Sequence, residues 1–215
     1  MNKLYSNNIT RKKIWDIGKF TCLLLMLAMF CQRGMGQATQ LTPIGSTLAD
    51  ITNTDDYYQL VDITSTFSGG IQFGANTYTS MYVGSNGYVT FGHANSGYSP
   101  LGIPGYTAGP IIAGQYDDLH PGVAGDIYYS QNGTYLVVTY SGVAPYRTPT
   151  GAGSGYNSFQ IVLRQGAGYN GSSNKNFQIE VRYQDLQWAK SGNATARPSA
   201  GWSTGTGLVY GQMPY

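Results

Sequence analysis

Hydrophobic and polar residues alternate along most of the chain beyond residue 54. The clearest example is residues 177–183 (FQIEVRY), where every second residue is hydrophobic and polar residues lie between them. A period of two is typical of a β-strand with one buried and one exposed face. Similar hydrophobic runs predict further strands at residues 57–63, 79–83, 88–91, 110–116, 126–130, 134–140 and 157–163.

The segments between these runs carry turn signals. Two strand pairs are joined by the dipeptides Asn86-Gly87 and Asn132-Gly133. Asn-Gly tolerates positive φ at both central positions of a type I′ turn, so each dipeptide predicts a two-residue hairpin. No helical period follows the first 36 residues. We therefore expect an all-β fold, an antiparallel β-sandwich or barrel-like sheet pair, with long surface loops at residues 93–109 and 145–155.

The N-terminus has the pattern of a secretory signal peptide. A basic segment precedes an apolar run at residues 20–31 (FTCLLLMLAMFC), and small residues follow at Gly34 and Gly36. This order is that of a cleaved leader, and the run is shorter than the roughly 20 residues that a membrane-spanning helix needs. We predict a signal peptide at 1–36, a polar lead-in at 37–54 and a β-domain at 55–215. The expected product is secreted or held at the cell surface, with no membrane span after cleavage.

Removal of this leader changes the composition of the chain. Both cysteines, Cys22 and Cys31, lie inside it, so the mature chain has neither disulfides nor thiol chemistry. Six of the 12 basic residues and one of the 10 acidic residues also lie there, which leaves 6 basic against 9 acidic residues and a net charge of −3. The remaining residues form no basic stripe, so we expect no nucleic-acid partner.

Seven segments in this order resemble the nidogen-like extracellular domain, over about residues 81–205. They are SNGYVTFG (85–92), PIIAGQYDDLH (110–120), GDIYYS (125–130), LVVTYSGV (136–143), NSFQIVL (157–163), VRYQDLQW (181–188) and AGWSTG (200–205). That domain occurs in nidogens, tectorins, some mucins and secreted bacterial proteins. The chain departs from the family at Gln115, where an aromatic residue is usual, and at Tyr140, where a tryptophan is usual.

The resemblance implies an adhesion or matrix-type module and no enzymatic activity. It assigns mainly structural roles to the residues that match the family. Asn86 and Gly87 are expected to form a turn, Trp188 to fill the core or a sheet edge, and Gly201 to permit a tight backbone conformation. The expected partner is an extracellular protein or glycan.

The most suggestive polar group is Asp117, Asp118 and Asp126, with His120 beside them. Adjacent carboxylates at the end of a strand, supplemented by backbone carbonyls, suit calcium, so the three aspartates are a candidate calcium site. The alternative is that one aspartate caps backbone amides while the others face solvent. The only two histidines, His93 and His120, are 27 positions apart, which argues against a transition-metal site.

Aromatic residues in the loops are the second group of candidates. Tyr98, Tyr106, Tyr146 and Tyr156 fall outside the predicted strands and could contact a ligand. A carbohydrate-binding module is therefore an alternative to a protein-binding one. A glycan-active hydrolase would need a carboxylate pair, for which the candidates are Asp117, Asp118, Asp126, Glu180 and Asp185. The chain contains no G-x-S-x-G motif, and we expect it not to be an enzyme.

Overall fold

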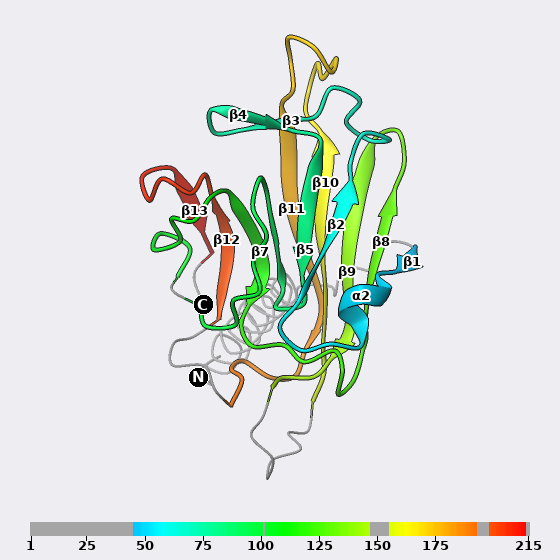
Figure 1. Ribbon diagram of the computed structural model, residues 1–215, viewed down its shortest axis with the longest axis vertical. Coiled ribbons are helices and arrows are strands. Elements are labelled where there is room, and N and C mark those ends of the chain that lie inside the picture. Colours follow the sequence, from blue (N-terminus) through cyan, green and yellow to red (C-terminus); the bar gives the residue numbers. More distant parts are fainter. Residues whose placement is uncertain (1–44, 101, 147–154, 193–197, 214–215) are drawn as a thin grey trace, which may run out of the picture. The chain divides into compact units, whose positions relative to one another are not determined.

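The computed structural model describes residues 45–100, 102–146, 155–192 and 198–213, and within them it is almost entirely β (Figure 1). One sheet has five antiparallel strands in the order β1 (Ser46–Thr47), β8 (Asp126–Gln131), β9 (Tyr135–Val143), β10 (Asn157–Gln165) and β11 (Phe177–Leu186). The other has six, in the order β13 (Tyr210–Gln212), β12 (Ser199–Ser203), β7 (Ile111–Tyr116), β6 (Tyr88–Thr90), β5 (Ser80–Gly84) and β2 (Tyr58–Asp62). A separate hairpin consists of β3 (Ile71–Phe73) and β4 (Asn76–Tyr78).

The two large sheets pack face to face around a shared core. Buried residues of both sheets belong to one hydrophobic cluster, among them Val61, Val83, Ile112, Leu136, Val138 and Ile161. The six-stranded sheet ends at β13 on one side and β2 on the other, and these strands do not pair to close a barrel within the described residues. The prediction of an all-β sandwich is confirmed. Local alternation identified strands such as β11, where Phe177, Ile179 and Tyr183 lie on one face and pack against the core.

Strand β7 is buried on both faces. Ile112 belongs to the core between the sheets, whereas Ile111 and Ala113 belong to a second cluster with Ile103 and Tyr106. The last two residues come from the long segment between β6 and β7. This segment, predicted as a surface loop, therefore covers the outer face of the six-stranded sheet with part of its length.

A polar network also joins the sheets at the end of the core. Asn157 in β10 donates from Nδ2 to Gln115 Oε1 in β7 at 2.8 Å. Its Oδ1 accepts from the backbone amides of Gln187 and Trp188 at 2.7 and 3.1 Å. The indole of Trp188 is buried and donates to the carbonyl of Val143 at 3.2 Å. Where the family usually has an aromatic residue, Gln115 thus places a side-chain amide, whose oxygen accepts a hydrogen bond from Asn157.

Both Asn-Gly hairpins form, but the predicted type I′ turns are wrong. Among the described residues no non-glycine residue has positive φ, so neither Asn86 nor Asn132 adopts the left-handed conformation that this turn needs. Three residues, 85–87, connect β5 to β6, and only Gly87 is left-handed, with φ of 83°. In the other hairpin Asn132 Oδ1 accepts from the amides of Thr134 and Tyr135 at 2.9 and 3.0 Å. The longer connections let each asparagine keep an ordinary φ and use its side chain instead.

Part of the predicted lead-in belongs to the sandwich. Strand β1 pairs with β8, and the four-residue helix α2 (Ala49–Thr52) follows it. Leu48 and Ile51 are buried in the core, and Thr52 Oγ1 accepts from the amide of Ile127 at 3.1 Å. The predicted signal peptide at 1–36 lies outside the described residues. In the part of the chain that is described, no helix is long and apolar enough to cross a membrane.

Candidate functional site

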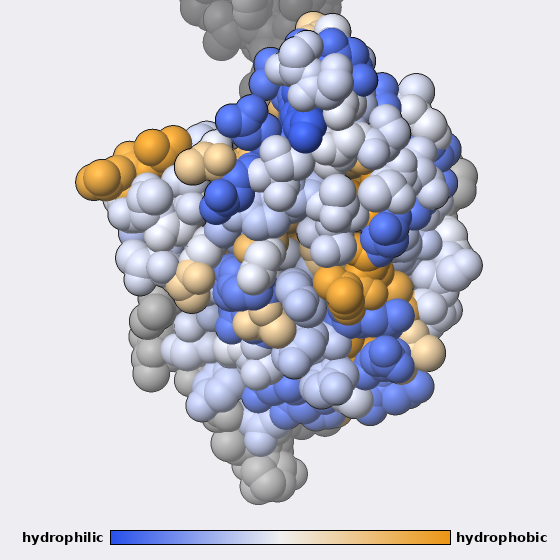
Figure 2. Space-filling view, turned by 45° about the horizontal axis from the view of Figure 1, so that its top comes forward, coloured by the Kyte–Doolittle hydropathy of each residue, from blue (hydrophilic) through white to orange (hydrophobic). Residues whose placement is uncertain are grey.

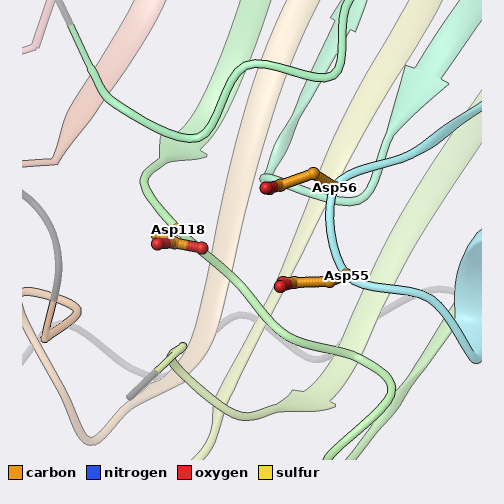
Figure 3. A group of neighbouring side chains, drawn as sticks. All are labelled: Asp55, Asp56 and Asp118. Atoms are coloured by element: carbon orange, nitrogen blue, oxygen red, sulfur yellow. The ribbon is translucent and has the colours of Figure 1, made fainter. Parts of the chain in front are cut away.

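Three carboxylates from distant parts of the chain converge at one end of the sandwich. Asp55 and Asp56 lie in the segment between α2 and β2, and Asp118 follows β7. Figure 3 shows the side chains of Asp55 and Asp56 extending toward the segment that carries Asp118. One carboxylate oxygen of each residue lies within 4.8 Å of those of the other two. We call these three residues the aspartate cluster.

The turn between β5 and β6 holds the two segments together. Asn86 donates from Nδ2 to Asp56 Oδ1 at 2.7 Å and accepts at Oδ1 from the amide of Leu119 at 2.8 Å. Beside it, Ser85 and Tyr57 exchange two hydrogen bonds, Ser85 N to Tyr57 O at 2.9 Å and Tyr57 N to Ser85 Oγ at 3.0 Å. Asn86, expected only to form a turn, is therefore the residue that positions the aspartate cluster.

Burial and repulsion between carboxylates destabilise the charged forms of Asp118 and Asp55. Asp118 is only 2 % exposed. Desolvation, followed by the charges of Asp56, Asp55 and Asp117, raises the pKa of Asp118 to about 7. Desolvation also raises the pKa of Asp55, although the nearby His120 opposes the shift. A group of acids perturbed in this way is a candidate functional site.

His120 borders the cluster on one side. Its Nε2 lies 3.6 Å from Asp55 Oδ2, beyond hydrogen-bond distance, and its Nδ1 is buried with no hydrogen-bond partner among the described residues. Its ring lies against Tyr146, with the ring centroids 5.6 Å apart. His120 therefore contributes at most a weak ion pair to one of the three acids.

The structure separates the three aspartates named from the sequence. Asp117 Oδ1 accepts from Ser191 Oγ at 2.7 Å and from the amide of Asp118 at 2.8 Å, and Oδ2 accepts from the amide of Ser191 at 3.1 Å. Asp126 lies in β8, where its Oδ2 accepts from the hydroxyl of Tyr128 at 3.0 Å. Asp117 thus caps local backbone, and only Asp118 joins the aspartate cluster. Asp55 and Asp56 were not among the sequence candidates, and the one available signal was their adjacency just before a predicted strand.

The four loop tyrosines also have different environments. Tyr106 is buried, and its hydroxyl lies 2.6 Å from His93 Nε2, so it offers no open ring face. Tyr98 and Tyr156 are about half exposed. Tyr146 is partly buried beside His120. Tyr98 and Tyr156 therefore remain the better candidates for contact with a partner.

A cavity of about 500 Å³ lies between two hairpins and the loop before β7. Its lining includes Phe73 and Asn76 of the β3–β4 hairpin, Tyr78, and Thr204 and Thr206 of the β12–β13 loop. The tip of that loop projects from the surface and is hydrophobic (Figure 2), with Leu208 86 % exposed. The cavity thus opens beside an apolar projection.

Two glycines allow the walls of this cavity to meet. Gly205 has φ of 80°, and a Cβ atom there would lie 2.3 Å from the carbonyl carbon of Gly109. Only a residue without a side chain permits this approach of the β12–β13 loop to the segment before β7. The shape of the cavity therefore depends on backbone contact between two loops.

Among the described residues, no charged side chain lines this cavity. The histidine in this lining, His93, has both nitrogens engaged, Nδ1 with the carbonyl of Phe91 at 3.1 Å and Nε2 with Tyr106. The described residues that line a second cavity, of about 200 Å³ beside Tyr183 and Trp188, likewise include no carboxylate. The aspartate cluster belongs to neither cavity.

The two open antiparallel sheets, which share one core, define the class of protein as an all-β sandwich module. Residues 35–205 match the NIDO-related family, and the chain belongs to that family. The resemblance to the nidogen-like domain is thus confirmed, and the match begins upstream of the segment that suggested it. No curated protein and no solved structure matches the chain.

Proposed function

We propose that this protein is a secreted, non-catalytic recognition module that mediates adhesion by binding a neutral saccharide in the 500 Å³ cavity. The observation that carries the proposal is the neutral lining of this cavity in a member of an extracellular-type family. Small-molecule sites of roughly 300–1,000 Å³ commonly combine aromatic surface with a few polar groups.

The lining has the chemistry that an uncharged sugar requires. Tyr78 is partly exposed and packs against Phe91, with the ring centroids 5.6 Å apart, so its ring is held in place. Asn76, Thr204 and Thr206 place amide and hydroxyl groups around the same space. Aromatic surface contacts the apolar face of a sugar ring, and amides and hydroxyls exchange hydrogen bonds with its hydroxyl groups.

The proposal that the protein is not an enzyme is supported by the position of its clustered aspartates, which lie outside the two cavities described above. Glycoside hydrolysis needs two carboxylates across a bound substrate, about 5–10 Å apart. Neither the 500 Å³ nor the 200 Å³ cavity includes a residue of the aspartate cluster, and no described residue that lines the larger one is a carboxylate. Glu180 is held by Arg182 and Arg164, at 2.6 and 3.3 Å, and is not available as an acid or base.

A glycan array with the mature protein tests this proposal. Ala108 lines the cavity and is exposed, so Ala108→Trp should fill the cavity without disturbing the core. Ala167→Trp introduces the same ring at an exposed position outside it and serves as the matched control. We expect retention on one class of neutral glycans, lost in A108W and kept in A167W. Failure of every neutral glycan, or equal binding by both variants, would sink the proposal.

Export belongs to the same proposal and has its own test. The leader-like segment at residues 1–36 supports it. Expression of the full chain should release a protein whose N-terminal sequence begins near Gln37. Recovery of the uncleaved chain with the cells would contradict export by this route.

A further inference from the structure

We propose that Asp55, Asp56 and Asp118 bind one calcium ion that ties the segment before β2 to the segment after β7. The three residues are contributed by parts of the chain 62 positions apart and meet at one place (Figure 3). This inference does not depend on saccharide binding, because the aspartate cluster lies outside the cavity proposed for the sugar.

A buried acceptor without a donor points to a missing ligand at this site. Asp118 is buried, with only 2 % of its surface exposed, and its Oδ1 has no hydrogen-bond partner among the described residues. Asp55 Oδ1 is also buried and without a partner. Buried polar atoms are nearly always satisfied by a donor, water or an ion, and leaving a charged one unsatisfied is costly. Both orphaned oxygens belong to the side chains that converge here.

Within the described ranges, the only basic side chain that pairs with the aspartate cluster is His120, at 3.6 Å from Asp55. Among the described residues the ion pairs are Arg164 and Arg182 with Glu180, and His120 with Asp55. Asp56 receives a neutral amide from Asn86, and no basic side chain of the described residues pairs with Asp118. Three carboxylates in a partly buried site repel one another, and a divalent cation would convert that repulsion into attraction.

The spacing and the donor type favour calcium. Calcium takes oxygen ligands at about 2.3–2.6 Å, so two ligands on opposite sides of the ion lie about 4.6–5.2 Å apart. Ligand oxygens that all lie within 4.8 Å of one another are compatible with this range. Magnesium usually keeps several waters and is bound through only one or two carboxylates, so a site of three protein carboxylates favours calcium. An all-carboxylate set also does not favour zinc, which prefers nitrogen and sulfur ligands.

Thermal unfolding of the mature protein in millimolar calcium chloride, and in a chelator, tests the site. The wild-type protein should melt at a higher temperature with calcium, since an ion that binds only the folded state stabilises it. Asp118→Asn and Asp56→Asn keep the size of each side chain but remove its charge. We expect at least a tenfold loss of calcium affinity by calorimetry in both variants, together with loss of the calcium-dependent melting shift.

Asp126→Asn is the matched control, because the sequence suggests Asp126 as a ligand while the structure places it outside the cluster. It should bind calcium as the wild type does. Identical wild-type melts with calcium and with chelator would overturn the proposal, as would unchanged binding in both D118N and D56N. Loss of binding in D126N but not in D118N would show that the ion sits elsewhere. Equal stabilisation by magnesium at the same concentration would refute the assignment of calcium.

Discussion

The hydroxyl of Tyr140 donates to the carbonyl of Gly84 at 2.7 Å and so links strand β9 of one sheet to strand β5 of the other. The same hydroxyl lies 3.1 Å from the carbonyl of Tyr88. The ring of Tyr140 stacks on Phe159, with the centroids 4.5 Å apart and the planes 11° from parallel. Tyr140 therefore supplies both a fully buried ring and a polar contact that crosses the core.

Replacing Tyr140 by phenylalanine should lower the free energy of unfolding by about 1–2 kcal/mol, because the ring is kept but two buried carbonyls lose a donor. Urea denaturation would measure this. Tyr135→Phe is the control, since the Tyr135 hydroxyl makes no hydrogen bond among the described residues, and it should change the midpoint little. Equal midpoints for wild type and Y140F would show that the hydroxyl contributes nothing.

Asn157→Ala should destabilise the protein more, by about 3 kcal/mol or more. The side chain is fully buried and bonds to Gln115 and to the backbone of Gln187 and Trp188. Truncation therefore leaves several buried polar groups without hydrogen-bond partners. Asn176→Ala, at an exposed position, is the matched control and should be nearly neutral. The prediction fails if chemical denaturation gives the two variants similar stabilities.

The two Asn-Gly turns should respond differently to alanine. At Gly87 φ is 83° and a Cβ would lie 1.9 Å from the carbonyl oxygen of Gln115, so G87A should cost about 2 kcal/mol or more. Gly133 does not have positive φ, and a Cβ there meets nothing within 4 Å. G133A should therefore be neutral or slightly stabilising, through a less flexible unfolded chain. A large loss of thermal stability in G133A would mean that the second turn is left-handed after all.

Stability should fall as the solution becomes strongly alkaline. Desolvation raises the pKa of Tyr183 to about 12, and it also raises the pKa values of Tyr88, Tyr106, Tyr116, Tyr129 and Tyr140. Below the unfolded pKa of about 10 both states keep these protons, and above it only the unfolded chain loses them. The contribution to stability is thus complete below that pH and declines as the pH rises toward the folded pKa values.

Tyrosinate absorbance and near-ultraviolet circular dichroism, followed together against pH, would measure this. We expect the buried tyrosines to ionise in the same cooperative step in which the tertiary signal is lost. Gradual ionisation with an intact tertiary signal would contradict the burial of these hydroxyls.

The strands of this protein could be predicted from the sequence because their signal is local. Alternation at residues 177–183 requires only that one face of the strand pack on the core, and the hydrophobic run at 157–163 marks a strand buried on both faces. The order of segments such as SNGYVTFG and VRYQDLQW likewise indicated the family that residues 35–205 match. Gly201, with φ of 139° and Gly211 against it, has the tight backbone expected for it.

The tertiary structure alone decided which polar residues act together. Asp117, Asp118 and Asp126 lie close together in the sequence. In the structure, however, Asp117 hydrogen-bonds to Ser191 and Asp126 to Tyr128. Asp118 instead meets Asp55 and Asp56, because pairing of β5, β6 and β7 brings the Asn86 turn between the two segments. A hydrophobic period carries information about neighbours a few positions away, whereas a site depends on which strand ends the sheet places side by side.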